Sequence, residues 1–289
     1  MKLRLFFSRI VWTLTLLAII GPLVGAGARA SSRTDAGDSS SAAAVTDAGD
    51  ALKLKTVVID PGHGGKDPGC VSADRKTYEK NVVLAVSKLF AEKIRKAYPD
   101  VNVILTRETD VFVELDKRAK IATKANANLF ISVHVNAAED PRTRKINTKA
   151  NGYSAWILGQ SSKYDAYGIN YSVVRRENSV IYLEDDYSTK YQALNSDSPE
   201  AKIFMQLMIN AYREQSVSFA EKTCQTMKGH SFSSDLGVRQ ENIAVLRLAT
   251  MPAVLVELGF ITNPTDLAYL RSKGSYEAMA ENLFRAFAE

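Results

Sequence analysis

The chain has 289 residues, of which 46% are hydrophobic and 24% are charged, and its formal net charge is +5. The basic excess belongs to residues 1–30, which hold four basic residues and no acid. The rest of the chain therefore has 33 basic and 32 acidic residues and a net charge of +1. This balance excludes a charge-driven association with nucleic acid, and we predict no nucleic-acid partner.

Residues 1–30 have the features of a signal peptide. Basic residues precede an apolar run from Ile10 to Val24, and Ala28-Arg29-Ala30 offers a small-residue cleavage site. The run is shorter than the roughly 20 residues of a spanning helix, so an uncleaved anchor is the weaker alternative. We expect an exported protein with no membrane span in its mature form. Its place is the periplasm if an outer membrane is present, and otherwise the cell wall or the exterior.

Residues 31–52 are small and polar, which predicts a disordered linker rich in Ser, Ala and Asp. Residues 53–289 then suit one folded domain. Cys70 and Cys224 allow one disulfide in an exported protein but do not require it.

The first half of this domain alternates strands with helices. We expect strands at 55–60, 101–106 and 129–135, with helices at 81–98 and 115–126. The strands are nearly continuous apolar runs, as in a parallel sheet that is covered on both faces. The sequence therefore predicts an α/β fold, a mainly parallel twisted sheet flanked by helices on both faces, in a single domain.

The second half is less regular and shows no internal repeat. We expect a strand at 153–158, helix over most of 201–228, strands at 244–248 and 253–258, and a closing helix at 276–288.

Two of the three histidines lie where a parallel sheet places ligands, at the carboxyl ends of strands. His63 follows the first strand in a glycine-rich loop, and His134 ends the most apolar strand. A single histidine after a strand is usually a core or loop residue. Two such positions, each followed by small residues, favour a metal site. We interpret His230 as an ordinary exposed residue.

A catalytic zinc takes three protein ligands, and two histidines with one glutamate are an established set. The carboxylate has to lie close to the loop after the first strand. Glu79 begins the next helix, whereas Asp67 and Asp74 are closer competitors within the loop. A helix terminus holds a ligand more rigidly than a glycine-rich loop, which favours Glu79.

Hydrolysis also needs a general base, because a metal lowers the pKa of water without delivering its proton to the leaving group. Glu257 interrupts an apolar strand near its carboxyl end, where an unpaired charge would be costly. A buried Glu–Arg pair is the structural alternative.

Five ordered segments resemble a known family: VVIDPGHGGKDPG, YEKNVVLAVSKLF, LTRETD, LFISVHVNA and VLRLATMPAVLVELGFITNPTD. They are similar to the zinc-dependent N-acetylmuramoyl-L-alanine amidases of the amidase 3 type, over residues 55–289. The resemblance implies one zinc ion on His63, Glu79 and His134, with Glu257 as catalytic glutamate. It also implies cleavage of peptidoglycan between the lactyl group of N-acetylmuramic acid and L-alanine, in wall remodelling or daughter-cell separation. Asn136 is a candidate substrate-binding residue, with turn stabilisation as the alternative.

The stretch 180–199 is longer than in the simplest members of that family. Some members cover their metal with an element in this region until a partner displaces it. We therefore hypothesise a lid or regulatory insertion that answers to a protein activator, with Tyr182, Tyr187 and Tyr191 as packing or sugar-contacting residues. A solvated surface loop is the alternative. A second departure is Leu236, where the family often has a basic residue.

Two other functions remain open at this point. A zinc carboxypeptidase that trims wall peptides would need a carboxylate clamp, for which Arg107, Arg118 and Arg239 are candidates. A non-catalytic wall-binding protein of the same fold is expected to have lost a ligand or Glu257, and all four residues are present.

Overall fold

The computed structural model describes residues 54–159, 168–191, 198–229 and 234–289. Six strands form one sheet in the order β2-β1-β3-β6-β4-β5. The first four strands in this order run parallel, whereas β4 pairs antiparallel with β6, and β5 lies parallel to β4. The strands are β1 (Thr56–Pro61), β2 (Asn102–Leu105), β3 (Leu129–Asn136), β4 (Tyr153–Leu158), β5 (Asp235–Glu241) and β6 (Ala253–Phe260).

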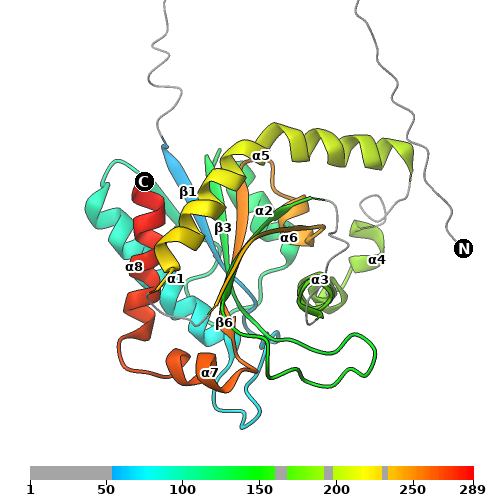
Figure 1. Cartoon of the computed structure of the whole chain (residues 1–289). Coiled ribbons are helices and arrows are strands. Elements are labelled where there is room, and N and C mark those ends of the chain that lie inside the picture. The colour runs from blue at the N-terminus through cyan, green and yellow to red at the C-terminus, as the bar shows by residue number, and fades with distance from the viewer. Residues whose placement is uncertain (1–53, 160–167, 192–197, 230–233) are drawn as a thin grey trace, which may run out of the picture. The chain divides into compact units, whose positions relative to one another are not determined.

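Helices cover both faces of the sheet, as Figure 1 shows. One face packs against α1, α5 and α8, and the other against α2, α3 and α6. The predicted α/β fold in a single domain is therefore confirmed. The helices are α1 (Glu79–Ala97), α2 (Leu115–Lys124), α3 (Ile169–Ser179), the short 3-10 helix η2 (Val180–Leu183), α4 (Tyr187–Lys190), α5 (Pro199–Met227), α6 (Ala244–Arg247), α7 (Pro264–Leu270) and α8 (Ser275–Ala288).

The central strands are buried along their whole length because helices lie on both sides. Every residue of β1, β3 and β6 is buried. Within β1, Val57 and Ile59 join the core under α1 and α8, and Val58 joins the core under α2 and α6. This alternation explains why these strands are continuous apolar runs in the sequence.

The predicted strand at 244–248 is wrong, because residues 244–247 form helix α6. Its apolar side chains are buried against the second face of the sheet, so the run is hydrophobic for packing reasons that do not distinguish helix from strand. The sequence also did not indicate α3, β5 or α7.

Cys70 and Cys224 are both buried free thiols, so the disulfide that the sequence allowed is not formed.

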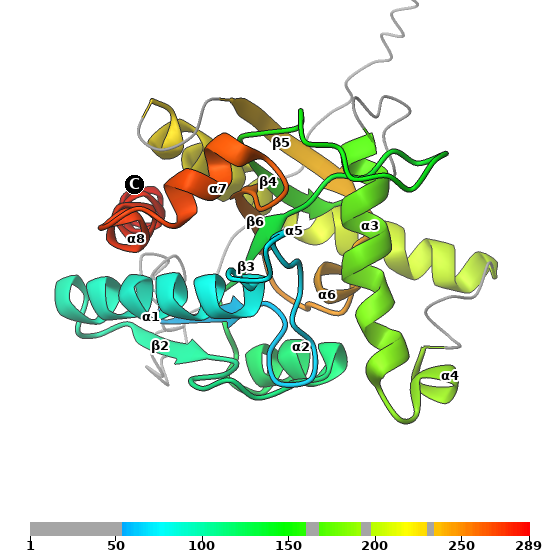
Figure 2. The same ribbon diagram turned by 90° about the horizontal axis from the view of Figure 1, so that it is seen from below.

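The carboxyl ends of β1, β3 and β6 meet at one end of the sheet, which Figure 2 shows from below. The loop after β1, the first turn of α1 and the C-terminal part of α3 surround this end. None of the helices in the described part of the chain has the length and apolar character needed to cross a bilayer. The boundaries predicted at residues 30 and 52 lie outside the described residues.

Candidate metal-binding active site

His63 stands in the loop that follows β1. Its backbone has a φ of 58°, which is unusual for a residue other than glycine. Two contacts hold it: Arg118 Nη2 donates to the His63 carbonyl at 2.7 Å, and His63 Nδ1 lies 2.8 Å from Asp67 Oδ2. The other ring nitrogen, Nε2, is buried and has no hydrogen-bond partner of regular geometry among the described residues. It faces the carboxylate of Glu79, 3.1 Å away.

Glu79 is the first residue of α1 and is fully buried. Its Oε2 accepts from the Cys70 amide at 2.7 Å, and its Oε1 accepts from the Val135 amide at 2.8 Å. These two backbone donors fix the carboxylate between the two histidines. Gly69 leaves room for it, since a Cβ at that position would lie 2.6 Å from Glu79 Oε2 and from His63 Cδ2.

His134 lies in β3 and brings the second imidazole to the cluster. Its Nδ1 is 3.1 Å from Glu79 Oε1, and its Nε2 is 3.1 Å from the Ser132 hydroxyl. The rings of His63 and His134 meet edge to face, with 4.9 Å between their centroids. The structure thus brings together the three residues that the sequence singled out as metal ligands.

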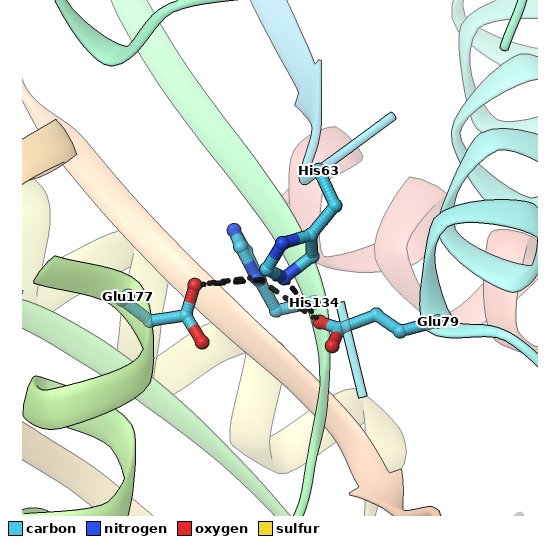
Figure 3. A group of neighbouring side chains, drawn as sticks. All are labelled: His63, Glu79, His134 and Glu177. Atoms are coloured by element: carbon cyan, nitrogen blue, oxygen red, sulfur yellow. Dashed lines mark hydrogen bonds and ion pairs between the residues drawn. The ribbon is translucent and has the colours of Figure 1, made fainter. Parts of the chain in front are cut away.

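Glu177 joins these three residues from α3, as Figure 3 shows. Its Oε2 lies 3.1 Å from His134 Nδ1 and 3.7 Å from His63 Nε2. One nitrogen or oxygen atom from each of His63, Glu79, His134 and Glu177 falls within 4.8 Å of the others. Sequence reasoning missed Glu177 as a member of the site. The Arg-Glu-Asn-Ser segment at 176–179 carries no local pattern that indicates a ligand.

Two buried carboxylates raise the pKa of both histidines. Burial alone would lower the pKa of His63, but the charges of Glu79 and Glu177 and the hydrogen bond to Asp67 raise it to about 10. Burial also opposes the charged form of His134, and Glu177 and Glu79 raise its pKa well above the usual value. Positive charge is therefore favoured at the centre of this cluster. A metal cation bound to neutral imidazoles would supply that charge in place of the protons.

Glu257 is fully buried on β6, where it pairs in register with His134 on β3 and with Ser154 on β4. Neither of its carboxylate oxygens has a hydrogen-bond partner among the described residues. Burial raises the pKa of Glu257 to about 8, and nearby Arg176 only partly offsets this. A carboxyl group with its pKa near neutrality suits proton transfer.

Arg176 connects Glu257 to Asn136. Its Nη2 lies 3.7 Å from Glu257 Oε1 and donates to Asn136 Oδ1 at 3.0 Å, while Nη1 donates to the Ala137 carbonyl. The Glu–Arg pair that the sequence left open thus exists, but at a distance beyond a direct hydrogen bond. The amide nitrogen of Asn136 is buried and has no partner within the described ranges, so it remains able to donate to a ligand.

The competing acids have other roles. Asp67 binds His63 Nδ1 and the Gly69 amide, which makes it a support for the histidine ring. Asp74 binds Arg271 and Ser72 instead.

The three candidate arginines of a carboxylate clamp are also engaged. Arg107 donates to backbone carbonyls, Arg118 pairs with Asp60, and Arg239 bonds Asn170. These contacts give no support to the carboxypeptidase alternative.

The fold has counterparts of known structure. The catalytic domain of CwlV, an N-acetylmuramoyl-L-alanine amidase from Bacillus (Paenibacillus) polymyxa, is 29% identical with a TM-score of 0.52, over 81% of this chain and 97% of that one. An amidase of the same name from Clostridium difficile has a TM-score of 0.57 at 24% identity, over 81% of this chain and 95% of that one. The fold is therefore that of the N-acetylmuramoyl-L-alanine amidase catalytic domains.

Sequence comparison identifies the family. Residues 57–289 match the N-acetylmuramoyl-L-alanine amidase family, and the chain belongs to it. AmiA of Escherichia coli is 31% identical over 73% of this chain and 68% of that protein. AmiC of Neisseria meningitidis is 28% identical over 78% of this chain and 50% of that protein. The chain also spans about half, 48%, of a Haemophilus influenzae relative that is 29% identical.

Proposed function

We propose that this protein hydrolyses the amide between the lactyl group of N-acetylmuramic acid and L-alanine of the stem peptide, with one zinc ion on His63, Glu79 and His134. The main support is the convergence of two buried imidazoles and a fixed carboxylate at the carboxyl end of a parallel sheet. Two histidines with one glutamate fit a zinc site that keeps a position for water. The unpartnered His63 Nε2 fits the same assignment.

Each side chain around the metal position has a role in this proposal. A zinc ion bound there would act as a Lewis acid toward the lactyl carbonyl and the attacking water. Glu257 takes the proton of that water and passes it to the departing alanine nitrogen. While α3 covers the site, Arg176 holds Asn136 and lies beside Glu257, so both groups are in contact with this helix. The free amide of Asn136 donates a hydrogen bond to the substrate.

The export signal at residues 1–30 and the linker at residues 31–52 remain part of the proposal. With 53–289 as the catalytic domain, the proposed activity acts on wall peptidoglycan outside the cytoplasmic membrane, in the periplasm if an outer membrane is present and otherwise in the cell wall or the exterior. N-terminal sequencing of the mature protein would locate the cleavage site.

Digestion of purified peptidoglycan tests the activity. We expect glycan chains without peptides, together with intact stem peptides that begin with L-alanine, as measured by mass spectrometry. His134→Ala should lose zinc in a titration and lose hydrolysis, because it removes a proposed ligand and one of the two imidazoles beside Glu79. Release of single D-amino acids from the wild-type digest would instead favour a carboxypeptidase.

We also propose that a protein partner acts on the stretch 180–199. Residues 192–197 lie outside the described ranges, but η2 and α4 adjoin α3, which carries Glu177. Glu184 accepts from the Leu115 amide and from the Tyr191 hydroxyl, which ties this stretch to α2. Tyr191 is 1% exposed and serves packing, whereas Tyr182 is 66% exposed and available to a partner. The CwlD amidase of Clostridioides difficile, 22% identical, has been solved in complex with the GerS lipoprotein.

Glu177→Ala tests this regulatory element more directly than deletion, because it leaves the contacts of Glu184 in place. In this proposal the Glu177 carboxylate holds α3 over the metal position. If α3 leaves that position in roughly a tenth of the molecules, removing the carboxylate should release α3 in the others and raise the basal rate about tenfold. The readout is muropeptide release by the full chain, with zinc content and thermal unfolding as controls. A lower or unchanged rate in the zinc-loaded variant would argue against regulation through Glu177.

A further inference from the structure

A second polar cavity of about 570 Å³ lies beside the first turn of α1. Its lining includes Lys76, Tyr78, Asn81, Arg271 and Tyr276. These residues come from the loop before α1, from α1 itself, from the connection between α7 and α8, and from the first turn of α8. Figure 2 shows α8, which follows this connection, beside α1.

Arg271 is fixed in this cavity by three side-chain contacts. Its Nε donates to the Thr77 hydroxyl at 2.8 Å, and its Nη2 lies 2.6 Å from Asp74 Oδ1 and 3.2 Å from the Ser72 hydroxyl. These contacts use one edge of the guanidinium, and its Nη1 has no partner within the described ranges. A guanidinium held in one orientation loses little conformational entropy when it binds an anion.

The cavity has a net positive charge. Its charged lining residues are Lys76, Arg271 and Asp74, and Asp74 already pairs with Arg271. The Lys76 ammonium makes no ion pair in the described part of the chain. Tyr78 and Asn81 add groups that can hydrogen-bond a peptide backbone. An anionic peptide therefore fits this cavity better than an uncharged sugar.

Only the first turn of α1 separates the cavity from the metal-binding cluster. The Glu79 side chain belongs to that cluster, while its neighbours Tyr78 and Asn81 line the cavity. A helix with its side chains is roughly 10–12 Å across, a span that three extended residues of about 10 Å cover together with the length of their side chains. The part of a stem peptide beyond L-alanine can thus reach the cavity while its first amide lies at the metal.

We infer that this cavity is a stem-peptide subsite, in which Lys76 and Arg271 bind a free carboxylate of the residues beyond L-alanine. The inference rests on the proposed amidase function. It assigns a specificity role to residues outside the metal-binding cluster and makes the state of the stem carboxylates, free or amidated, a determinant of substrate choice.

Binding of the stem tripeptide to the full-length, zinc-loaded protein tests the subsite without any hydrolysis. Calorimetry would compare the tripeptide with free carboxylates and the same tripeptide with amidated carboxylates. Lys76→Gln should weaken binding of the free form about threefold, as expected for one exposed ion pair. Arg271→Gln should weaken it about tenfold through a lost charge-assisted hydrogen bond. Neither variant should change binding of the amidated form.

Lys96→Gln is the matched control, because Lys96 is exposed near the other end of the same helix. Arg271→Gln also removes contacts to the loop before α1 and can loosen that loop. Lys76→Gln removes no side-chain contact, so the Lys76 variant is the decisive test of the subsite. Equal affinity of the wild-type protein for both tripeptides, or equal loss with both in the Lys76 variant, would overturn the subsite. Failure of the amidase function would appear separately, as selective tripeptide binding without cleavage of peptidoglycan.

Discussion

Glu257→Gln is expected to lower kcat for wall hydrolysis by about 1,000-fold, the usual contribution of a general base. The substitution keeps the size of the side chain and removes its ability to accept a proton from water. None of the proposed zinc ligands is changed, so zinc content after dialysis should equal that of the wild-type protein. Initial rates of muropeptide release by the zinc-loaded variant would measure the effect.

The pH dependence of stability gives this variant an independent control. The folded pKa of Glu257 is raised to about 8 in the metal-free protein because burial disfavours its charge. A raised carboxyl pKa means that stability falls as the pH rises from the unfolded pKa to the folded one. Metal-free Glu257→Gln should therefore gain thermal stability over the wild type at pH 9 and show the smallest difference near pH 4. A variant that keeps more than a tenth of the wild-type rate would exclude Glu257 as the base.

The apolar pattern of the sequence was sufficient to predict the centre of the sheet. β1, β3 and β6 are buried on both faces, so hydrophobicity marks them without reference to partners. His63 and His134 were identifiable because strand ends are recognisable from the glycine and asparagine residues that follow them. The choice of Glu79 over Asp67 and Asp74 agrees with the geometry, because of these three acids Glu79 alone approaches both imidazoles.

Glu177 could not be found by the same reasoning. It reaches His134 from a helix 43 positions further along the chain, and no local pattern reports such a contact. Helix α3 has Asn170, Ser172 and Glu177 among its buried residues, so its buried face does not appear as an apolar stripe. The wrongly predicted strand at 244–248 is the opposite case. An apolar pattern is present there, but a short apolar run fits either a strand or a buried helix.

Arg118→Met is expected to lower the free energy of unfolding by about 3–5 kcal/mol, because it leaves a buried carboxylate without its partner. Arg118 is 1% exposed, and its Nη1 lies 2.8 Å from Asp60 Oδ1. Asp60 also accepts from the hydroxyls of Thr106 and Ser132. Burial alone would raise the pKa of Asp60, but Arg118 and these hydroxyls outweigh it and lower that pKa.

The sign of the pH effect distinguishes this explanation from simple loss of packing. In the wild-type protein the lowered pKa of Asp60 contributes stability that disappears as the pH falls through that pKa. Without Arg118, burial dominates and Asp60 binds a proton more readily, so the deficit of Arg118→Met should be largest at pH 7 and shrink toward pH 4. Adding Asp60→Asn should recover most of the loss. Urea unfolding of the metal-free single and double variants measures both effects, and a pH-independent deficit would show that packing of the arginine stem matters more than its charge. Arg118 also donates to the His63 carbonyl. Because Arg118→Met releases the loop that carries this histidine, the same substitution should also weaken zinc binding at the active site.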